Sequence, residues 1–377
     1  MDERSLHRLI GTIIAPERLE DDCAVIPCGN LAMVASTDML HETTDFPAGM
    51  TDWQVGWMAV AVTLSDIASM GAAPGQVLLA VGLDRPQRLR GIMEGARDCS
   101  IAFGAELVGG DLDAHRELTI VSTGLGTVAP EYLVRRRGAR PGDVIAVTGP
   151  LGEAQAALNG YGRHMKELLE PQPRVKEGLA LGRAGVSAMM DISDGLALSL
   201  HDLLAVNDCG FSIDTARLPL PTGVPEDEGR ALALYGGGDF ELLFCAPPGI
   251  LPVQGVETHV IGEAVVERTV HGGVPEDGEG EECLSAVNNR CEHHQRPCDV
   301  QGDRHHPLGE PGEDIERREG LESVDLRLNG GIVGDEGHRP ITGEGYIREH
   351  AREHEECNDH ALDAAPTDPE EEAMRPR

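Results

Sequence analysis

Six short acidic segments, each set among small residues and glycine, constrain this 377-residue chain more than any other feature. Most of them follow a short aliphatic or β-branched run, so we expect their aspartates where strands end and turns begin. Aspartate is a poor strand residue and a good turn residue, and the recurrence of this pattern indicates carboxylates gathered at one rim of the fold. The segments are Asp21-Asp22, Ser36-Thr37-Asp38, Leu64-Ser65-Asp66, Gly109-Gly110-Asp111, Asp191-Ile192-Ser193-Asp194-Gly195 and Gly236-Gly237-Gly238-Asp239.

Carboxylates with few nitrogen or sulfur neighbours favour a magnesium site, because Mg²⁺ binds through carboxylates, water and substrate phosphates. The first interpretation is therefore metal-dependent phosphoryl transfer. For any single segment, turn formation or helix capping is an equally good explanation; the six together favour the metal site. The chain has no Gly-x-x-x-x-Gly-Lys-Ser/Thr, and its only lysines, Lys166 and Lys176, lie in other contexts, so a P-loop is excluded.

The charge and hydropathy of the chain limit its partners. With 65 acidic and 31 basic residues the net charge is −34, which argues against nucleic acid and anionic membranes as partners. No run of about 18 uncharged apolar residues occurs, and Met1-Asp2-Glu3 is no signal-peptide start, so we expect a cytoplasmic protein. Four cysteines in apolar contexts are expected to be reduced and to pack in the core: Cys23, Cys99, Cys209 and Cys245.

Apolar patterning predicts mixed strands and helices. A capping box at Thr51–Gln54 opens a helix that closes at Gly71 and carries Asp66 in its last turns. An acid near a helix C-terminus opposes the helix dipole, and a bound cation is one reason for it. A second helix runs from Pro86 to about Phe103. Further helices are expected at 152–158, 174–183 and 196–206. Strands are expected at 31–36, 76–83 (buried on both faces), 106–108, 118–128, 144–148, 189–192, 211–214 and 240–245.

Three regions follow from this patterning. The turn-rich stretch 135–143 is the expected boundary between an N-terminal α/β domain, 1–135, and a C-terminal α+β domain, 136–270. Residues 271–377 are rich in Glu, Gly, His, Arg and Pro, a composition typical of a disordered acidic tail. The tail is either a genuine appendage or a read-through or frame-shifted end. Its cysteines, Cys283, Cys291 and Cys298, have irregular spacing, and we expect no zinc site there.

In order and spacing, the motifs of residues 15–268 resemble the thiamine-monophosphate kinases, within the aminoimidazole ribonucleotide synthetase superfamily. The resemblance implies a two-domain α+β fold with mixed sheets flanked by helices. It also implies ATP-dependent phosphorylation of thiamine monophosphate with several Mg²⁺ ions, and a homodimer whose N-terminal strands pair across a two-fold axis. The strings that carry it are Asp-Asp-Cys-Ala-Val, Ser-Thr-Asp, Ala-Val-Thr-Leu-Ser-Asp-Ile-Ala-Ser-Met-Gly-Ala, Gly-Gly-Asp, Arg-Pro-Gly-Asp-Val-Ile-Ala-Val-Thr-Gly, Asp-Ile-Ser-Asp-Gly-Leu and Gly-Gly-Asp-Phe-Glu-Leu.

The resemblance also assigns roles to individual residues. Asp45 and Gly238 fall where the family contacts the thiamine phosphate. Positions that contact ATP in the family are matched by Gly110, Asp111, Arg136 and Ser193, with Phe103 near an aromatic position that packs on the nucleotide. The implied magnesium ligands are Asp22, Ser36, Thr37, Asp38, Asp66, Asp111, Asp191 and Asp194. No covalent nucleophile is implied, because the acceptor phosphate is already anionic.

Several features depart from the family or have simpler explanations. Glu20 replaces the glycine that usually precedes the paired aspartates, many relatives carry glutamate in place of Gly238, and the family's C-terminal aromatic segment is not recognisable. By themselves, Arg135–Arg137 predict a solvated loop and Phe103 a core position, and Asp143 and Asp214 are assigned to structure. Alternative functions are another ATP-dependent kinase or synthetase of the superfamily, or a catalytically weak nucleotide- or thiamine-binding homologue.

Overall fold

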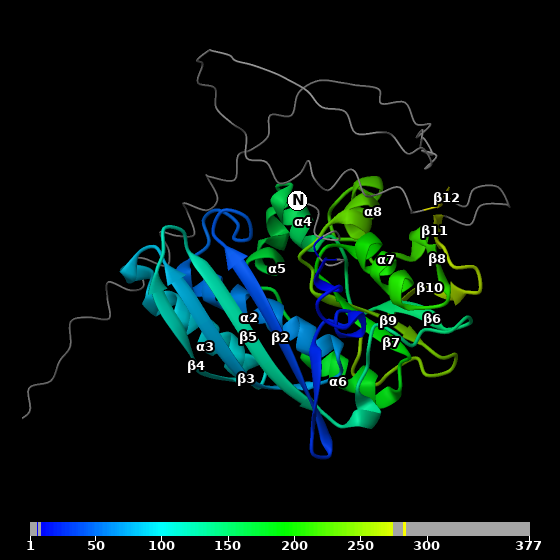
Figure 1. The fold of residues 1–377 in the computed structure, drawn as a ribbon. Helices are drawn as coiled ribbons and strands as arrows, with labels where there is room; N and C mark the ends of the chain where they lie inside the picture. Colours follow the sequence, from blue (N-terminus) through cyan, green and yellow to red (C-terminus); the bar gives the residue numbers. More distant parts are fainter. Residues whose placement is uncertain (1–5, 7–8, 274–281, 284–377) are drawn as a thin grey trace, which may run out of the picture. The chain divides into compact units, whose positions relative to one another are not determined.

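The chain forms two β-sheets with helices packed against them (Figure 1). The computed structural model describes residue 6, residues 9–273 and residues 282–283. The first sheet has the strand order β1-β2-β5-β3-β4, and all its neighbours are antiparallel except β3 and β4. Its strands are β1 (Ala24–Cys28), β2 (Leu31–His41), β3 (Ala73–Leu83), β4 (Glu106–Ala114) and β5 (Thr119–Val128).

Two helices, α2 (Asp52–Ser69) and α3 (Leu89–Ala102), cover one face of this sheet (Figure 1). The expected capping box is present, since Thr51 accepts a hydrogen bond from the Gln54 amide and the Gln54 side chain accepts one from the Thr51 amide. Helices α2 and α3 approach each other closely at Gly56 of α2. A Cβ on this residue would lie 1.9 Å from the carbonyl oxygen of Ile92 in α3. The contact therefore excludes any larger residue at that position.

The other face of the first sheet carries several exposed apolar side chains. Alternate residues of β2, such as Val34 and Ser36, are buried under the helices, whereas Met39 is 59% exposed. Leu78 of β3 is 39% exposed, so the expectation that this strand is buried on both faces is wrong. In the single chain, one face of β3 packs on the helices, and the other face is open although its side chains are also largely apolar.

Two aspartates lie within strands and not after them, which corrects the expected strand ends. β2 continues past Ser36 through Asp38 to His41, and β4 continues past Val108 through Asp111 to Ala114. Both strands are held by ladder hydrogen bonds to apolar neighbours in the sheet. Pairing within the sheet has therefore outweighed the low strand propensity of aspartate.

The second sheet has the order β12-β11-β8-β10-β6-β9-β7, and the linker 129–143 joins it to the first. It consists of β6 (Val144–Val147), β7 (Ala188–Ile192), β8 (Gly210–Asp214), β9 (Glu241–Ala246), β10 (His259–Val265), β11 (Val270–Gly273) and β12 (Glu282–Cys283). The accompanying helices are α4 (Glu153–Leu158), α5 (Met165–Leu169), α6 (Val175–Ala184), α7 (Leu196–Val206) and α8 (Glu226–Tyr235). Short 3₁₀ turns occur at Pro16–Arg18, Pro86–Arg88, Pro130–Tyr132, Gly162–His164 and Thr215–Arg217.

The four cysteines predicted to be core residues are buried and reduced, as expected. Asp143 and Asp214 are structural: Asp143 accepts hydrogen bonds from the Arg140 amide and Ser187, and Asp214 caps a 3₁₀ turn. β11 crosses the expected boundary at residue 270 and pairs with β8. Apart from β11 and β12, the expected tail lies outside the described residues. Among the described helices, none is long and apolar enough to span a bilayer.

Candidate functional site

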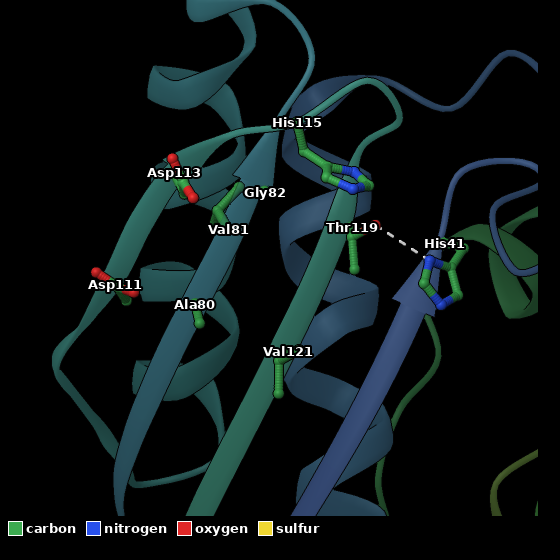
Figure 2. Close-up of a pocket in the computed structure, with 9 residues that line it drawn as sticks. All are labelled: His41, Ala80, Val81, Gly82, Asp111, Asp113, His115, Thr119 and Val121. Carbon is green, nitrogen blue, oxygen red and sulfur yellow. Dashed lines mark hydrogen bonds between the residues drawn. The ribbon is translucent and has the colours of Figure 1, made fainter.

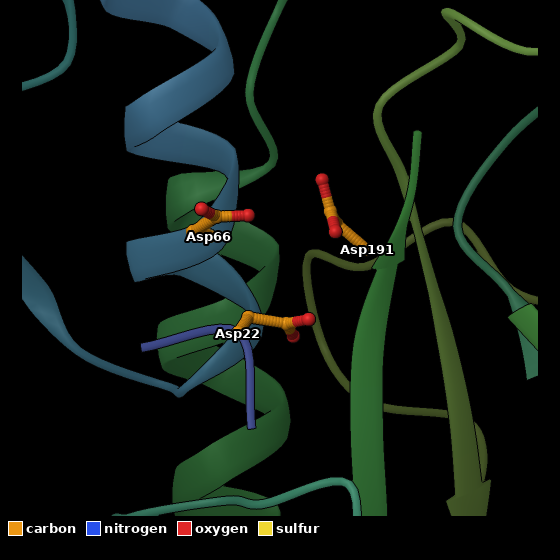
Figure 3. A group of neighbouring side chains, drawn as sticks. All are labelled: Asp22, Asp66 and Asp191. Carbon is orange, nitrogen blue, oxygen red and sulfur yellow. The ribbon is translucent and has the colours of Figure 1, made fainter. Parts of the chain in front are cut away.

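Three aspartates from distant parts of the chain converge on one point (Figure 3). One carboxylate oxygen from each of Asp22, Asp66 and Asp191 lies within 4.8 Å of the other two. Asp22 precedes β1, Asp66 lies in the last turn of α2, and Asp191 lies near the end of β7. Three carboxylates at this spacing repel one another unless protons or a cation neutralise them.

Hydroxyl groups of α2 hold this aspartate cluster (Asp22, Asp66 and Asp191) in place. Ser65 donates a hydrogen bond to Asp191 at 2.8 Å, and Ser69 donates to Asp22 at 2.5 Å. From β2, the Ser36 hydroxyl donates to Asp66. The cluster is therefore assembled around the C-terminal half of α2. Asp66 lies in the last turns of this helix, as expected from the sequence.

Burial and like charge shift the titration of these groups. Burial raises the pKa of Asp191 to about 7, helped by the charge of Asp22 and opposed by the hydrogen bond from Ser65. Burial also raises the pKa of Asp66 well above its usual value, and the charges of Asp191, Asp38 and Asp22 add to the shift. Such shifts mark a site that favours protons or a cation, since desolvated like charges are costly.

The second acidic segment contributes from β2. Asp38 accepts a hydrogen bond from Thr63 of α2 at 2.8 Å, and its pKa is raised by burial against the opposing effect of that bond. Thr37 lies on the opposite, open face of the strand, 3.0 Å from the hydroxyl of Thr123. The structure thus brings Asp38 and Ser36 to the aspartate cluster and directs the Thr37 side chain away from it.

The arginine run of the linker meets the acidic run before β1, residue against residue. Arg135 pairs with Asp21, Arg136 with Asp22, and Arg137 with Glu20. Arg135 and Arg137 are exposed, as expected of a solvated loop, but each is ion-paired, and Arg136 is partly buried. The charge of Asp22 raises the pKa of the Arg136 guanidinium against the opposing effect of burial, so the arginine stays charged beside the aspartate cluster.

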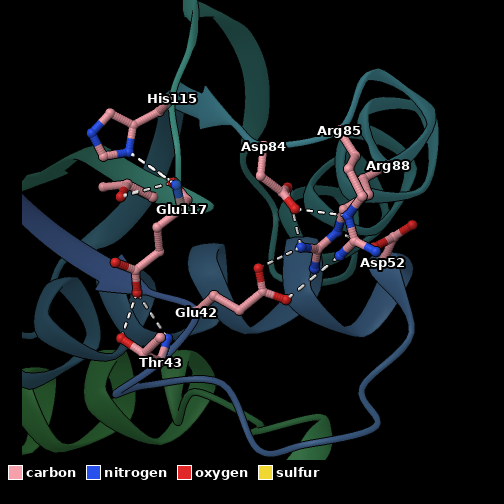
Figure 4. A network of polar contacts seen from close by, with 9 residues as sticks. Glu42, Thr43, Asp52, Asp84, Arg85, Arg88, His115 and Glu117 are labelled. Carbon is pink, nitrogen blue, oxygen red and sulfur yellow. Dashed lines mark hydrogen bonds and ion pairs between the residues drawn. The ribbon is translucent and has the colours of Figure 1, made fainter.

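The loop that carries Asp45 is anchored at its base by a network of charged groups (Figure 4). Arg88 contacts Glu42, Asp52 and Asp84, and Glu117 accepts from both the amide and the hydroxyl of Thr43. Asp45 itself is exposed and accepts hydrogen bonds from the His41 amide and Thr44.

Asp111 lies apart from the aspartate cluster. It lines a pocket of about 310 Å³ on the open face of the first sheet, with Asp113, His41, His115 and Thr119 among its neighbours (Figure 2). Strands β5 and β3 separate β4 from β2, and with strands about 4.8 Å apart Asp111 is about 14 Å from Asp38. Gly110 is on the same edge strand, so the structure does not bring these two residues to the cluster within one chain.

The remaining predicted residues surround the end of β7 or lie at α3. Ser193 and Asp194 are exposed in the turn after β7, and the Ser193 carbonyl accepts a hydrogen bond from the Gly238 amide at 2.7 Å. Gly238 has φ +90°, which favours glycine. Phe103 is half-buried and packs edge-on against Trp57, with 6.0 Å between the ring centroids. It also lines a small pocket with Arg174 and Lys176.

The sequence-based reasoning missed the polar groups that support the cluster. Thr63 and Ser69 are polar positions in a helix that is otherwise almost entirely apolar, spaced three residues on either side of Asp66. That spacing places all three on one helix face, so it could have identified them. The buried Glu241, which pairs with Arg174, was also missed.

Comparison with known proteins defines first a class and then a family. The model of the AIR synthase related protein N-terminal domain matches residues 20–128, and that of the C-terminal domain matches residues 140–270. Together they cover more than half of the chain and agree with the two sheets. The fold and the acidic site therefore define an AIR synthase related protein.

Curated relatives and solved structures narrow this class. The thiamine-monophosphate kinase of Methanospirillum hungatei is 56% identical over 246 residues, 65% of this chain and 85% of that protein. The thiamine-monophosphate kinase of Halobacterium salinarum is 42% identical over 256 residues, which cover 66% of this chain and 86% of that protein. The crystal structure of the Stenotrophomonas maltophilia thiamine-monophosphate kinase has a TM-score of 0.62 at 28% identity, covering 70% of this chain and 94% of that one. The chain belongs to the thiamine-monophosphate kinase family.

A further solved structure, AaThiL complexed with AMPPCP and TMP, has the same fold. Its TM-score is 0.67 at 24% identity, and the match covers 74% of this chain and 96% of that chain.

Proposed function

We propose that this protein transfers the γ-phosphoryl group of ATP to thiamine monophosphate, in line and with the help of several Mg²⁺ ions, to give thiamine diphosphate. The observation that carries the proposal is the aspartate cluster, in a chain that is 56% identical over 246 residues to a thiamine-monophosphate kinase. A structural neighbour was solved with AMPPCP and TMP, a nucleotide analogue and the phosphate acceptor of this reaction. We retain the expectation that the enzyme acts in the cytoplasm.

The residues of the cluster fit magnesium. They offer carboxylate and hydroxyl oxygens, the donors that Mg²⁺ prefers. Burial and like charge raise the pKa values of Asp66 and Asp191, which supports a site that favours a cation. The proposed ligands at the cluster are Asp22, Asp66 and Asp191, with Ser36 and Asp38 beside them. The other proposed ligands are Asp194 and, on the open face, Thr37 and Asp111. When bound, the ions neutralise the repulsion between the two phosphate groups and align them.

The chain's own residues bind and orient the substrates. Arg136 provides a permanently charged guanidinium beside Asp22, suited to a nucleotide phosphate. Ser193, Gly110, Asp111 and Phe103 are the other proposed nucleotide contacts. Asp45 and Gly238 are the proposed contacts of the thiamine phosphate. The acceptor phosphate is already anionic at neutral pH, so the reaction requires no general base from the protein.

We further propose that the protein is a homodimer that forms through the open face of the first sheet. That face carries exposed Met39 and Leu78, and exposed apolar side chains gathered on one face of this kind mark association surfaces. Asp111 lies on the same face, and two strands separate its strand from β2. Because Asp111 of the same chain does not reach the cluster, we propose that the second copy supplies this aspartate.

An ADP-release assay with thiamine monophosphate and MgATP tests the activity. We expect turnover that requires thiamine monophosphate and that falls about 100-fold or more in Asp66→Asn, because a charge-stabilising group is lost. The matched control is Asp227→Asn, an exposed acid in α8, which should retain full activity. Turnover with another acceptor would indicate a different kinase of the superfamily. MgATP binding without turnover on any acceptor would indicate a binding homologue.

A further inference from the structure

The hydroxyl group of Ser122 is an exception in the described part of the chain. It is the one buried side-chain polar atom there without a hydrogen-bond partner, and Ser122 is only 1% exposed. A buried unpaired hydroxyl is costly, and native proteins rarely keep one without a reason such as an ordered water or ion.

Ser122 lies directly beside Asp38. In the register of β2 and β5, Asp38 is the cross-strand partner of Ser122. Residues paired in this way point to the same face of the sheet, with Cβ atoms about 5 Å apart. That face lies under α2, because Ile120 and Ser122 of β5 are both buried there. The unpaired hydroxyl therefore lies on the same face as the Asp38 carboxylate, across the strand pair from it, although no hydrogen bond joins the two groups.

Only one oxygen of Asp38 is held by the described residues. Thr63 donates to Oδ2 at 2.8 Å, and the methyl group of Thr63 lies over Gly124, 2.8 Å from where a Cβ would be. Thr63 is thus fixed with its hydroxyl towards Asp38. Oδ1 of Asp38 has no hydrogen bond within the described part of the chain, and Ser122 is the buried donor nearest in register to it.

We propose that Ser122 is a positioning residue that, once the metal ion is bound, donates its hydroxyl hydrogen through one water to Oδ1 of Asp38 and so fixes the carboxylate. The inference rests on the proposed function, in which Asp38 is a magnesium ligand. Thr63 and Ser122 then hold the two oxygens from opposite sides, as outer-sphere partners of metal ligands commonly do. The unpaired hydroxyl is retained because it serves metal affinity and not the stability of the free protein.

The substitution Ser122→Ala separates these two effects. We expect the metal-free protein to be at least as stable as the wild type in thermal unfolding, because an unpaired polar atom is removed. We expect its affinity for Mn²⁺ alone, measured by electron paramagnetic resonance without nucleotide, to fall about tenfold. The matched control is Ser100→Ala, a buried serine whose hydroxyl bonds within α3 to the Ala96 carbonyl; its Mn²⁺ affinity should equal that of the wild type.

Asp38→Asn distinguishes the failure of this inference from that of the proposed function. If Asp38→Asn loses Mn²⁺ affinity and Ser122→Ala keeps it within twofold, the positioning role is overturned and the metal site stands. If Asp38→Asn binds Mn²⁺ like the wild type, Asp38 is not a ligand, and both the positioning role and the place of Asp38 in the proposed ligand set are overturned. A loss in both variants, with Ser100→Ala unchanged, supports the positioning role.

Discussion

The buried aspartates of this chain differ in what compensates their charge. Asp191 and Asp66 receive hydrogen bonds from serine hydroxyls and repel each other. Asp239 instead accepts the backbone amides of Gly152 at 2.6 Å and Ala154 at 3.2 Å, at the start of α4. Backbone amides at a helix start are a built-in partner for an anion, so Asp239 has a structural role that needs no metal.

The titration of Asp239 predicts a pH dependence of stability. Burial raises its pKa to about 7, despite the opposing amide bonds. Because the folded protein holds a proton that the unfolded chain releases near pH 4, this group makes stability fall as pH rises from about 4 to about 7. We expect Asp239→Asn to remove a fall of a few kcal/mol in the free energy of unfolding across that window. Urea denaturation at several pH values measures it, and equal pH slopes in both proteins would contradict it.

At this scale the sequence predicted the acidic groups but not all their partners. The segment Glu20-Asp21-Asp22 and the arginines Arg135–Arg137 are more than 100 residues apart, and nothing in either segment identifies the other. Asp66 was different, because its position in the last turn of a helix was already unfavourable and so indicated a site. An acid in an unfavourable position of a helix can be recognised from the sequence, whereas an ion pair between distant segments cannot.

Among the secondary-structure elements, α2 does most to form the site. Thr63, Ser65, Asp66 and Ser69 of this one helix reach Asp38, Asp191, Ser36 and Asp22 in turn. Its C-terminal half also packs on α6, where a Cβ on Gly178 would lie 2.1 Å from the carbonyl oxygen of Ala68. The position of α6 against α2 therefore depends on the absence of a side chain at residue 178.

Gly178→Ala tests this packing. An added methyl group would collide with backbone and push α6 away from α2, so we expect a loss of about 1–3 kcal/mol in the free energy of unfolding. Mn²⁺ affinity should also fall, since Ala68 lies between Asp66 and Ser69. Gly162→Ala is the control, because no heavy atom lies within 4 Å of its added Cβ. Chemical denaturation of both variants measures the effect. If Gly178→Ala is as stable as Gly162→Ala, the contact between α2 and α6 accommodates the added methyl group and the prediction fails.

The strands show what pattern alone could and could not predict. The apolar runs located β2 and β4, but each strand continues through its aspartate, because pairing with neighbouring strands is a property of the sheet and not of the segment. The same applies to β3, whose continuous apolar run predicted burial on both faces. One face of it lies under α2 and α3, and Leu78 faces outwards. An apolar strand sequence does not show whether the residues that bury each of its faces belong to the same chain.

For the whole molecule, the open question is how Asp111 joins the aspartate cluster. It lies on the open face, while Asp38 points to the helix-covered face and two strands intervene. No rotation of a side chain spans about 14 Å. If Asp111 is a ligand, as we propose, it comes from a second copy, and each active site then combines the cluster of one protomer with Asp111 of the other.

This arrangement predicts complementation between two inactive variants. Asp66→Asn and Asp111→Asn should each lose turnover, but a mixed dimer contains one site with both aspartates intact and one with neither. With random exchange half of the dimers are mixed, so an equal mixture should recover about a quarter of wild-type activity. Turnover after co-refolding measures it. Adding Leu78→Glu to both variants places a charge on the open face and should abolish the recovery, whereas Leu158→Glu, at an exposed leucine of α4, should not. If the mixture stays inactive while mixed dimers are detected by mass, Asp111 does not act across the dimer.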